Sequence, residues 1–595
     1  MTDTSTATKP DEKTWFGHPR PLAVLFSTEM WERFGYYGMR AVLILYLVKH
    51  FVFADRVGSG LYGAFTSLVY LTPLVGGYIA DRYFGSKKAV KFGAILMSAG
   101  YLMLAFTGGP QAKPFVTING HHYDLQVVET GDTTTQYVID GAYRHKITGN
   151  PDKSISLDGT TGALPSKVAA ANYRFDAERP ALPIIMLFVS LGLIVVGNGY
   201  FKPNISTIVG TLYPEGDRRR DSGFTIFYMG INLGSIISQT LVPLIAVKWG
   251  YQWGFAFAGI GMLLAWMRIQ FSSKMLAEYG NPPPGAGNRD FIIIVLSLLA
   301  VPVAWFLLNN AMVAAQAADT AGAATGILGY LKSQPLLGQI MFVVFIGAMA
   351  GIPLWSAFSL PPVDRNRMIV AVVLTFFSVV FWTLFEQAGS SLTLFADRNT
   401  DLFLGNLPFI GPYTMPAGQV QIFNPLFIVI FAALFSIMWN WLGARGLEPS
   451  VPVKFSIGLL LVGLGFLTLV FGAKFHDVAF RVPLFWLAAA YFLHSIGELC
   501  LSPVGLSMIS KLSVPRLVGM MMGLWFLSSS VAQYVGGIIA QFASTETVAG
   551  QVLNPEVSLN TYLGVFQQIG IAGIVSGVVL LILSPFLKRG MHGIN

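Results

Sequence analysis

One apolar stretch near the N-terminus carries charges that the interior of a lipid bilayer does not accept on an exposed surface. Residues 29–40 read Glu-Met-Trp-Glu-Arg-Phe-Gly-Tyr-Tyr-Gly-Met-Arg, and they lie between the apolar runs 21–26 and 41–48. Their polar members recur at helical spacing, which places them on one face of a helix. A charge at bilayer depth costs about 2.5 kcal/mol or more, so it must face a partner or a water-filled cavity. The stretch predicts the polar wall of a transport cavity, with self-neutralising structural ion pairs as the alternative.

The composition is that of a protein with many membrane spans. Of the 595 residues, 54% are hydrophobic and 11% are charged, whereas soluble proteins carry about 25% charged residues. The net charge of +8 fits basic cytoplasmic loops better than nucleic-acid binding. Cys500 is the single cysteine, which excludes an intramolecular disulfide. The first twenty residues are polar and do not resemble a cleaved signal peptide, so we expect the first span to direct insertion.

A helix needs about twenty apolar residues to cross a bilayer, and fourteen stretches of the chain meet this requirement. They form groups of six, two and six, and two six-helix bundles around a midplane site are the general plan of alternating-access carriers. The expected spans lie near 21–48, 57–80, 88–107, 181–209, 222–246, 252–272, 291–309, 338–357, 369–395, 418–442, 454–473, 483–508, 517–541 and 562–586. The expected domains are an N-terminal segment (1–20), an N-terminal bundle (21–272), a linker with the helix pair (273–368), a C-terminal bundle (369–586) and a tail (587–595).

Lysine and arginine gather in the short loops on one side of the membrane when the predicted spans are counted along the chain. The positive-inside rule places these loops, and both termini, in the cytoplasm. The basic residues concerned are Arg82, Lys87, Lys88, Arg218, Arg219, Arg220, Arg365, Arg367, Arg445, Lys454, Lys511, Arg516, Lys588 and Arg589. We therefore expect a multi-pass protein of the plasma membrane, that is, the cell inner membrane.

Two polar segments interrupt the pattern of spans. Residues 108–180 contain short runs of strand-forming residues separated by turn signals such as Asn-Gly and Asp-Gly. This pattern predicts a small β-rich insert, on the extracytoplasmic side by helix count. It is either a substrate-capturing module or a decorative loop, and the residues do not decide between the two. Residues 273–290 contain Asn-Pro-Pro-Pro-Gly and are expected to form a cytoplasmic linker. The two spans after this linker carry almost no charge, which favours scaffolding or lipid contact over a transport path.

The N-terminal bundle holds further polar groups at helical spacing. Tyr70 ends a polar face of the second span, and the loop after that span contains Asp81-Arg82. A carboxylate in such a loop can meet a helix N-terminus and hold one state of a carrier, with ordinary loop topology as the alternative. Lys202 lies deep in the fourth span beside a proline, so it needs a carboxylate or an anionic substrate as its partner. Asn232 belongs to a polar face of the fifth span, which suits either a peptide backbone or helix packing.

Glu29 and Glu32 are the expected partners of Lys202, and a permanent structural salt bridge is the alternative.

In the C-terminal bundle Glu386 is isolated in a long apolar run. Such a carboxylate is easily protonated, as a proton carrier requires. Asp397, three turns further out, is the expected outer-gate partner of Arg40.

The later spans offer weaker candidates. Glu498 lies at membrane depth with His494 one turn away, and a lone membrane histidine is more often a hydrogen-bonding residue than a titrating one. Trp382, Asn424 and Trp525 lie in apolar spans and could line a cavity. Each of these signals is weak when taken alone.

Together these segments resemble the proton-coupled oligopeptide transporter family, a branch of the major facilitator superfamily, along nearly the whole chain. The resemblance rests on Glu29-x-x-Glu32-Arg33-Phe-x-Tyr-Tyr-Gly, Lys202-Pro-Asn, Phe227-Tyr228-x-x-x-Asn232-x-Gly and the segments around Trp382, Glu386 and Glu498. The extra helix pair looks like that of prokaryotic members. The resemblance implies an all-α major facilitator fold and proton-driven uptake of di- and tripeptides. It also implies a functional monomer without a cofactor or metal.

The resemblance assigns a role to each candidate by position. Arg40 and Lys202 would receive the peptide carboxylate, and Glu498 would receive the amino terminus. The other residues expected to line the peptide pocket are Tyr36, Tyr37, Tyr70, Asn232, Trp382, Asn424 and Trp525. The residues expected to couple protons are Glu29, Glu32, Arg33, Lys202 and Glu386. The residues expected to gate the path are Arg40, Asp397, Asp81 and Arg82.

Two features limit the resemblance, and two other functions compete with it. Animal members of the family use a histidine in the second span, and this chain has none between Gly58 and Ala80. Coupling is therefore expected to rest on carboxylates. The 108–180 insert is also unlike a minimal bacterial member. A carrier of nitrate or another small anion is the nearest alternative. A membrane enzyme is the more distant one, and the sequence shows no metal-ligand cluster, nucleophile motif or phosphate loop to support it.

Overall fold

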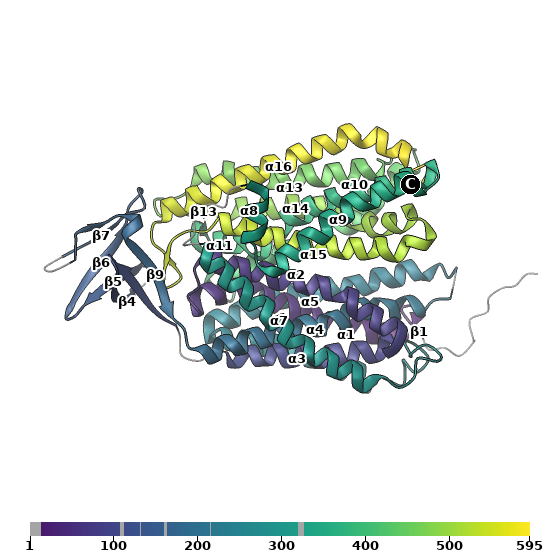
Figure 1. Ribbon diagram of the computed structural model, residues 1–595, viewed down its shortest axis with the longest axis horizontal. Helices are drawn as coiled ribbons and strands as arrows, with labels where there is room; N and C mark the ends of the chain where they lie inside the picture. Colours follow the sequence, from purple (N-terminus) through teal and green to yellow (C-terminus); the bar gives the residue numbers. More distant parts are fainter. Residues whose placement is uncertain are drawn as a thin grey trace, which may run out of the picture.

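The structure, a computed structural model, describes residues 14–107, 112–130, 133–159, 164–214, 216–318 and 326–594. Figure 1 shows long helices lying side by side, with a small sheet at one end of the bundle. Helices of the first half of the chain occupy the lower part of this view, and those of the second half occupy the upper part. The predicted division into two helical halves and a β-rich insert is therefore confirmed.

Each of the fourteen predicted spans is helical over most of its length. The N-terminal bundle contains α1 (Pro21–Leu45), α2 (Asp55–Ile79), α3 (Ser86–Phe106), α4 (Ala181–Thr211), α5 (Arg219–Trp249) and α6 (Tyr251–Phe271). The extra pair is α7 (Asp290–Ala318) and α9 (Leu336–Ser359), with the short α8 (Gly326–Ser333) between them. The C-terminal bundle contains α10 (Pro362–Phe385), α11 (Ser391–Asn399), α12 (Phe423–Gly443), α13 (Val451–Gly472), α14 (Leu484–Leu512), α15 (Val518–Phe542) and α16 (Pro555–Gly590).

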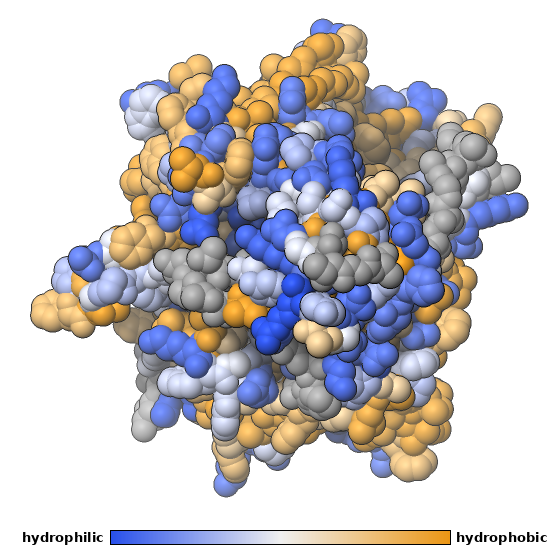
Figure 2. Space-filling model, turned by 90° about the vertical axis from the view of Figure 1, so that its left-hand side faces the viewer, coloured by the Kyte–Doolittle hydropathy of each residue, from blue (hydrophilic) through white to orange (hydrophobic). Residues whose placement is uncertain are grey.

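Thirteen helical segments of the described chain are long and apolar enough to cross a membrane. The helix α1 has the length of a span as well, but it carries Glu29, Glu32, Arg33 and Arg40. The surface agrees with a membrane setting. Figure 2 looks onto the sheet end of the molecule and shows hydrophilic residues across the centre of that face, with hydrophobic residues gathered at its margins.

The seventh core span is interrupted. We expect one span over 369–395, whereas α10 ends at Phe385 and a 3₁₀ turn, Glu386–Gly389, precedes α11. Gly389 lies where two side chains of the other bundle approach the backbone closely. A Cβ at this position would lie 1.8 Å from the Tyr62 hydroxyl and 2.9 Å from Arg40 Nε. The break therefore lets groups from α1 and α2 reach Glu386.

The two bundles meet along α2 and α15. Gly63 lies against Gly537, since a Cβ on either residue would lie 2.7 Å from the Cα of the other. Ser530 of α15 donates a 2.7 Å hydrogen bond to the carbonyl of Ser67 on α2. The extra pair flanks this seam, because α7 packs against α2 and α4 while α9 packs against α10 and α15. The pair thus touches both bundles, in agreement with the scaffolding role expected for it.

The segment before α7 is fixed to the loop between α2 and α3. Lys87 donates a 2.9 Å hydrogen bond from Nζ to the Leu276 carbonyl, and its backbone N–H donates a 2.8 Å bond to the Gly280 carbonyl. Lys88 forms a 2.5 Å ion pair with Asp290 at the start of α7. We assigned both lysines only to membrane topology, and that interpretation was incomplete because both hold the linker.

The insert between α3 and α4 is a seven-stranded sheet in the order β8-β7-β6-β5-β4-β3-β9, and every neighbouring pair is antiparallel. Its strands are β3 (Lys113–Ile118), β4 (His121–Thr130), β5 (Thr133–Asp140), β6 (Tyr143–Gly149), β7 (Ile155–Leu157), β8 (Lys167–Val168) and β9 (Tyr173–Glu178). Val116, Ile118 and Val138 belong to a hydrophobic core separate from that of the helices. The insert is therefore a small folded unit rather than an irregular loop.

The packing of α2 against α4 allows a test with two adjacent glycines. A Cβ on Gly76 would lie 2.1 Å from the Gly199 carbonyl oxygen, whereas the nearest atom to a Cβ on Gly77 is 3.5 Å away. We expect Gly76→Ala to destabilise the protein by about 1–3 kcal/mol through overpacking. Gly77→Ala should leave stability unchanged or raise it slightly, because alanine favours helix. Thermal unfolding in detergent measures both variants, and equal midpoints would contradict this packing.

Candidate functional site

The polar face of α1 forms a buried carboxylate–guanidinium cluster. Arg33 Nε lies 2.9 Å from Glu29 Oε1 and 2.6 Å from Glu32 Oε2, and all three side chains are at most 5% exposed. Within the described chain, Glu29 Oε2 and Glu32 Oε1 accept no hydrogen bond. The Arg33 guanidinium thus faces two carboxylates, each with an oxygen that accepts no hydrogen bond from the described residues.

Arg40 crosses from the N-terminal to the C-terminal bundle. Its Nη2 donates to Glu386 Oε2, and its Nε donates a 2.9 Å hydrogen bond to the hydroxyl of Tyr62. Both members of the ion pair are buried. Glu386 is therefore not the isolated carboxylate that its apolar sequence context indicates. Its partner comes from a helix 346 positions away in the chain.

The expected outer pair between Arg40 and Asp397 is not formed in this structure. Asp397 instead lies 2.5 Å from the ammonium of Lys49, at the end of α1. The turn at Glu386–Gly389 is the physical reason. It places Glu386 within reach of Arg40 and leaves Asp397 beside Lys49.

Lys202 lies close to the α1 cluster without joining it. Its ammonium is 3.9 Å from the centroid of the Tyr70 ring, a cation–π geometry. Glu32, Glu29 and Arg33 all act on its charge. Among the described residues Lys202 forms no ion pair, so the direct salt bridge expected with Glu29 or Glu32 is absent in this state. The ammonium is thus held near the carboxylates and remains available to an anionic group.

Glu498 is held by residues of its own, C-terminal, bundle. Asn424 of α12 donates a 2.9 Å hydrogen bond to Glu498 Oε2, and the same amide lies 3.1 Å from Ser495 Oγ. Glu386 and Arg40 are among the charges that act on Glu498. His494 is turned away into the bundle, where its ring bonds the Val462 carbonyl at 3.1 Å, in the packing role expected for it.

The remaining candidates differ in how closely they approach this cluster. Tyr36 and Tyr37 lie beside Arg33, which is 5.7 and 6.0 Å from their ring centroids. Asn232 donates to the carbonyl of Tyr228 on its own helix. Trp382 packs on two phenylalanines of α10, and Trp525 lies against Gly505. Asp81 and Arg82 are exposed, and Arg82 lies over the Tyr78 ring.

A second buried ion pair between the bundles escaped the sequence analysis. Arg398 of α11 binds both oxygens of Asp55 at the start of α2, and the two side chains are 2% and 1% exposed. The backbone N–H of Thr545 donates to the same carboxylate at 3.0 Å. A signal was present, because Phe-Ala-Asp-Arg occurs at 53–56 and again at 395–398, after the first span of each bundle. The aspartate of the first copy pairs with the arginine of the second.

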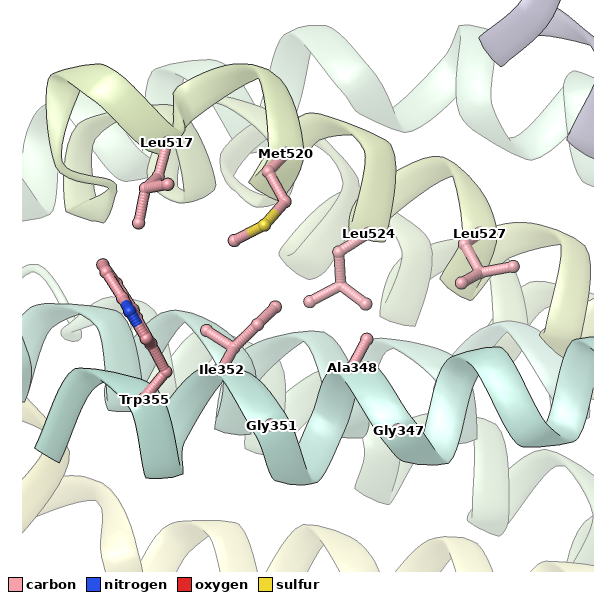
Figure 3. Close-up of a pocket in the computed structure, with 9 residues that line it drawn as sticks. All are labelled: Gly347, Ala348, Gly351, Ile352, Trp355, Leu517, Met520, Leu524 and Leu527. Atoms are coloured by element: carbon pink, nitrogen blue, oxygen red, sulfur yellow. The ribbon is translucent and has the colours of Figure 1, made fainter. Parts of the chain in front are cut away.

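An apolar groove lies away from these charges. It has a volume of about 510 Å³ between α9 and α15, with Trp355 and Leu517 at one end and Ala348 and Leu527 at the other (Figure 3). Its walls are apolar throughout, so it suits contact with lipid rather than passage of a polar substrate. The polar cluster around α1 is therefore the stronger candidate for a transport site.

Comparison with known proteins identifies the family of the chain. The model of the POT family matches residues 87–555. The chain belongs to the POT family. It is 32% identical over 98% of its length to an uncharacterized transporter of Bacillus subtilis, YclF, of which 97% is covered. It is 29% identical over 96% of its length to dipeptide and tripeptide permease A of Escherichia coli, of which 94% is covered.

Solved structures agree with this membership. The peptide transporter POT in complex with sulfate superposes with a TM-score of 0.70 at 30% identity, over 98% of both chains. A mutant of that transporter in complex with alafosfalin gives a TM-score of 0.69, also at 30% identity and over 98% of both chains. The chain is thus a multi-pass membrane transporter with the POT fold, and not an enzyme. The expected family and fold are confirmed.

The Asp55–Arg398 pair gives a stability prediction. Asp55→Asn leaves the Arg398 guanidinium buried without its counter-charge, which costs about 3–5 kcal/mol. The matched control is Asp152→Asn on the insert, where the pair with Lys167 is more than half exposed. An exposed pair contributes about 0–1 kcal/mol. Thermal unfolding in detergent should therefore separate the two variants clearly, and an equal loss in both would show that the buried pair adds no special stability.

Proposed function

We propose that this POT-family chain is a proton-coupled symporter that takes up di- and tripeptides by alternating access. The observation that carries the proposal is the placement of opposite charges on the two bundles. Arg40 and Lys202 belong to the N-terminal bundle, and Glu498 belongs to the C-terminal bundle. A short peptide is a zwitterion, so its carboxylate and its amino group can each meet a counter-charge. Named relatives are dipeptide and tripeptide permeases, which supports the same cargo.

The proposed peptide site uses the residues assigned by position. Arg40 and Lys202 receive the carboxylate, and Glu498, oriented by Asn424, receives the amino terminus. The aromatic and amide groups proposed to line the pocket are Tyr36, Tyr37, Tyr70, Asn232, Trp382 and Trp525. Lys202 supports this assignment because its ammonium lies over Tyr70 without an ion pair among the described residues. Arrival of an anionic group would give this half-buried charge a partner.

Proton coupling is proposed to work through competition for two arginines. Arg40 binds Glu386, and Arg33 binds Glu29 and Glu32. When a peptide carboxylate reaches Arg40, Glu386 loses its partner and is stabilised by protonation. The proton then moves with the peptide because the two binding events favour each other. Release of the proton on the other side restores the Arg40–Glu386 pair.

The proposed gates lie at the two ends of the path. Lys49–Asp397, Arg40–Glu386 and Asp55–Arg398 all join the first half of the chain to the second half. Lys49 and Asp55 lie at the ends of α1 and α2 that face the insert, so this end is closed. Asp81 and Arg82 are exposed at the other end of α2 and are proposed to close the path there. We propose that the insert faces outward, that both termini lie in the cytoplasm of a plasma-membrane protein, and that the monomer is functional.

A carrier of nitrate or another small anion is the competing function. An anion carrier would use Arg40 and Lys202 as well, because both side chains are cationic and can bind an anion. The carboxylate Glu498 with its Asn424 donor favours peptide, because a carboxylate in the site binds an amine and repels an anion.

One prediction of this proposal concerns the transported substrate. Labelled dialanine should accumulate in proteoliposomes above its equilibrium level when an inward proton gradient is present, and only then. Excess unlabelled dialanine should abolish this uptake, whereas nitrate at the same concentration as the unlabelled dialanine should leave it unchanged. Block by nitrate together with labelled-nitrate uptake would instead establish the anion function.

Another prediction of this proposal concerns the role of Lys202 in peptide binding. Lys202→Ala should lower dialanine uptake at least tenfold, because a charge-assisted contact in a dry site contributes about 1.5–3 kcal/mol. Lys88→Ala is the matched control, since this lysine is 44% exposed in its pair with Asp290. N-acetylated dialanine methyl ester, which lacks both charges, should be a poor competitor for wild type. Equal uptake by Lys202→Ala and Lys88→Ala would remove Lys202 from the peptide site.

A further inference from the structure

The sheet inserted between α3 and α4 touches both bundles. Its covalent connections are to the N-terminal bundle alone, since the chain enters it from α3 and leaves it into α4. Arg179, at the end of β9, reinforces this attachment. It donates hydrogen bonds of 2.8 and 2.6 Å to the carbonyls of Phe51 and Val52, beyond α1, and it lies over the Phe53 ring. The sheet is thus fixed to the N-terminal bundle.

The opposite side of the sheet contacts the loop between α15 and α16, which belongs to the C-terminal bundle. This loop carries a two-stranded hairpin, β14 (Thr547–Val548) and β15 (Gln551–Val552), here called the C-terminal hairpin. Val548 is fully buried and belongs to the hydrophobic core of the sheet, and Leu553 packs against that core. The insert therefore completes its own core with side chains from the other bundle.

Polar contacts hold the same boundary. The Tyr173 hydroxyl lies 2.6 Å from Glu546 Oε2 and 2.8 Å from the Lys153 carbonyl. Burial, together with the adjacent Glu546 carboxylate, raises the pKa of Tyr173, so its hydroxyl stays protonated and can donate. Asn554 caps α16 through Oδ1, which accepts from Val557 N–H, while its Nδ2 donates a 2.9 Å bond to the Gly149 carbonyl.

The backbone approaches are close on both sides of the C-terminal hairpin. A Cβ on Gly149 of the sheet would lie 2.7 Å from Leu553 Cγ. On the far side, a Cβ on Gly550 would lie 2.7 Å from the carbonyl oxygen of Val48, in the π-helical segment Tyr46–His50 that follows α1. The hairpin is therefore enclosed between the sheet and this segment, two parts of the N-terminal bundle. Figure 1 shows the sheet meeting the helices at this end of the molecule.

We propose that the insert sheet is a conformational latch that holds the two bundles together at its own end of the carrier. This inference rests on the proposed alternating-access function. Opening the path at this end requires the bundles to separate here, and the sheet must then release the C-terminal hairpin while it stays on the N-terminal bundle. Because its core loses Val548 when this happens, the sheet stabilises the closed state relative to the open one.

The first test measures opening without using transport. A cysteine-free parent, Cys500→Ser, receives Ser59→Cys on α2, a position that is fully buried at the seam with α15. Reaction of this cysteine with N-ethylmaleimide in the purified full-length protein then reports separation of the bundles. Tyr173→Phe should raise the labelling rate about fivefold, the effect of losing one hydrogen bond that exists only in the closed state.

The matched control is Tyr143→Phe, since Tyr143 lies on β6 of the same sheet and is 58% exposed. It should label at the parent rate. Equal rates for Tyr173→Phe and Tyr143→Phe would overturn the latch. Val548→Ala is a second weakening variant that acts through packing, and it should accelerate labelling in the same direction.

The second test locks the latch. In the Cys500→Ser background, Gly149→Cys and Leu553→Cys should form a disulfide on oxidation, because a Cβ on Gly149 would lie 2.7 Å from Leu553 Cγ. Dialanine uptake should then fall by more than tenfold and return on reduction. The control disulfide, Tyr137→Cys with Lys146→Cys, joins paired residues of β5 and β6 within the sheet and should leave uptake unchanged. Full uptake by the Gly149–Leu553 cross-linked protein would overturn the proposal.

Together, these tests distinguish a failure of the latch proposal from a failure of the peptide-transport proposal. If no variant moves dialanine but the labelling rate responds to Tyr173→Phe, the latch stands and the peptide function fails. If dialanine accumulates but labelling and cross-linking have no effect, the peptide function stands and the insert is not a latch.

Discussion

Charge inside a low-dielectric membrane protein must be compensated, and this requirement organises the two bundles. Arg33 is compensated within α1, whereas Arg40 and Arg398 take their carboxylates from the opposite half of the chain. A buried ion is costly when its partner leaves, by several kcal/mol. At the end of the molecule that carries the insert, the bundles can therefore separate only when a peptide, a proton or water replaces each lost partner. The same constraint that closes the structure supplies a means of coupling closure to binding.

The arrangement gives the two halves different functions in the proposed cycle. The N-terminal bundle holds Arg33, Arg40 and Lys202, and the C-terminal bundle holds Glu386 and Glu498. A zwitterion placed between them attracts both halves, while a proton on Glu386 cancels one of the attractions that keep the end closed. The insert adds a third attraction that involves no transported species, because Val548 and Glu546 bind the sheet in every closed carrier. The balance between open and closed states can thus be set without altering the transport site.

Hydropathy and helical spacing predicted every span and the β-rich insert, because membrane burial imposes long apolar helices and turn residues mark strand ends. They also identified the polar face of α1. They could not predict which charges meet. Glu386 appeared isolated because its partner Arg40 lies in another helix. Asp397 was expected to pair with Arg40, which it does not do in this structure, because no residue pattern marks the turn at Glu386–Gly389. The Asp55–Arg398 pair could have been inferred from the repeated Phe-Ala-Asp-Arg, had the two halves been compared.

The central claim is that Glu386 exchanges its arginine for a proton when peptide binds, and one variant tests it directly. Glu386→Gln keeps the shape of the side chain and removes its charge. In proteoliposomes this variant should still exchange labelled for unlabelled dialanine across the membrane, while accumulation driven by a proton gradient falls to the equilibrium level. Accumulation equal to that of the wild type would contradict the account and remove Glu386 from the coupling mechanism.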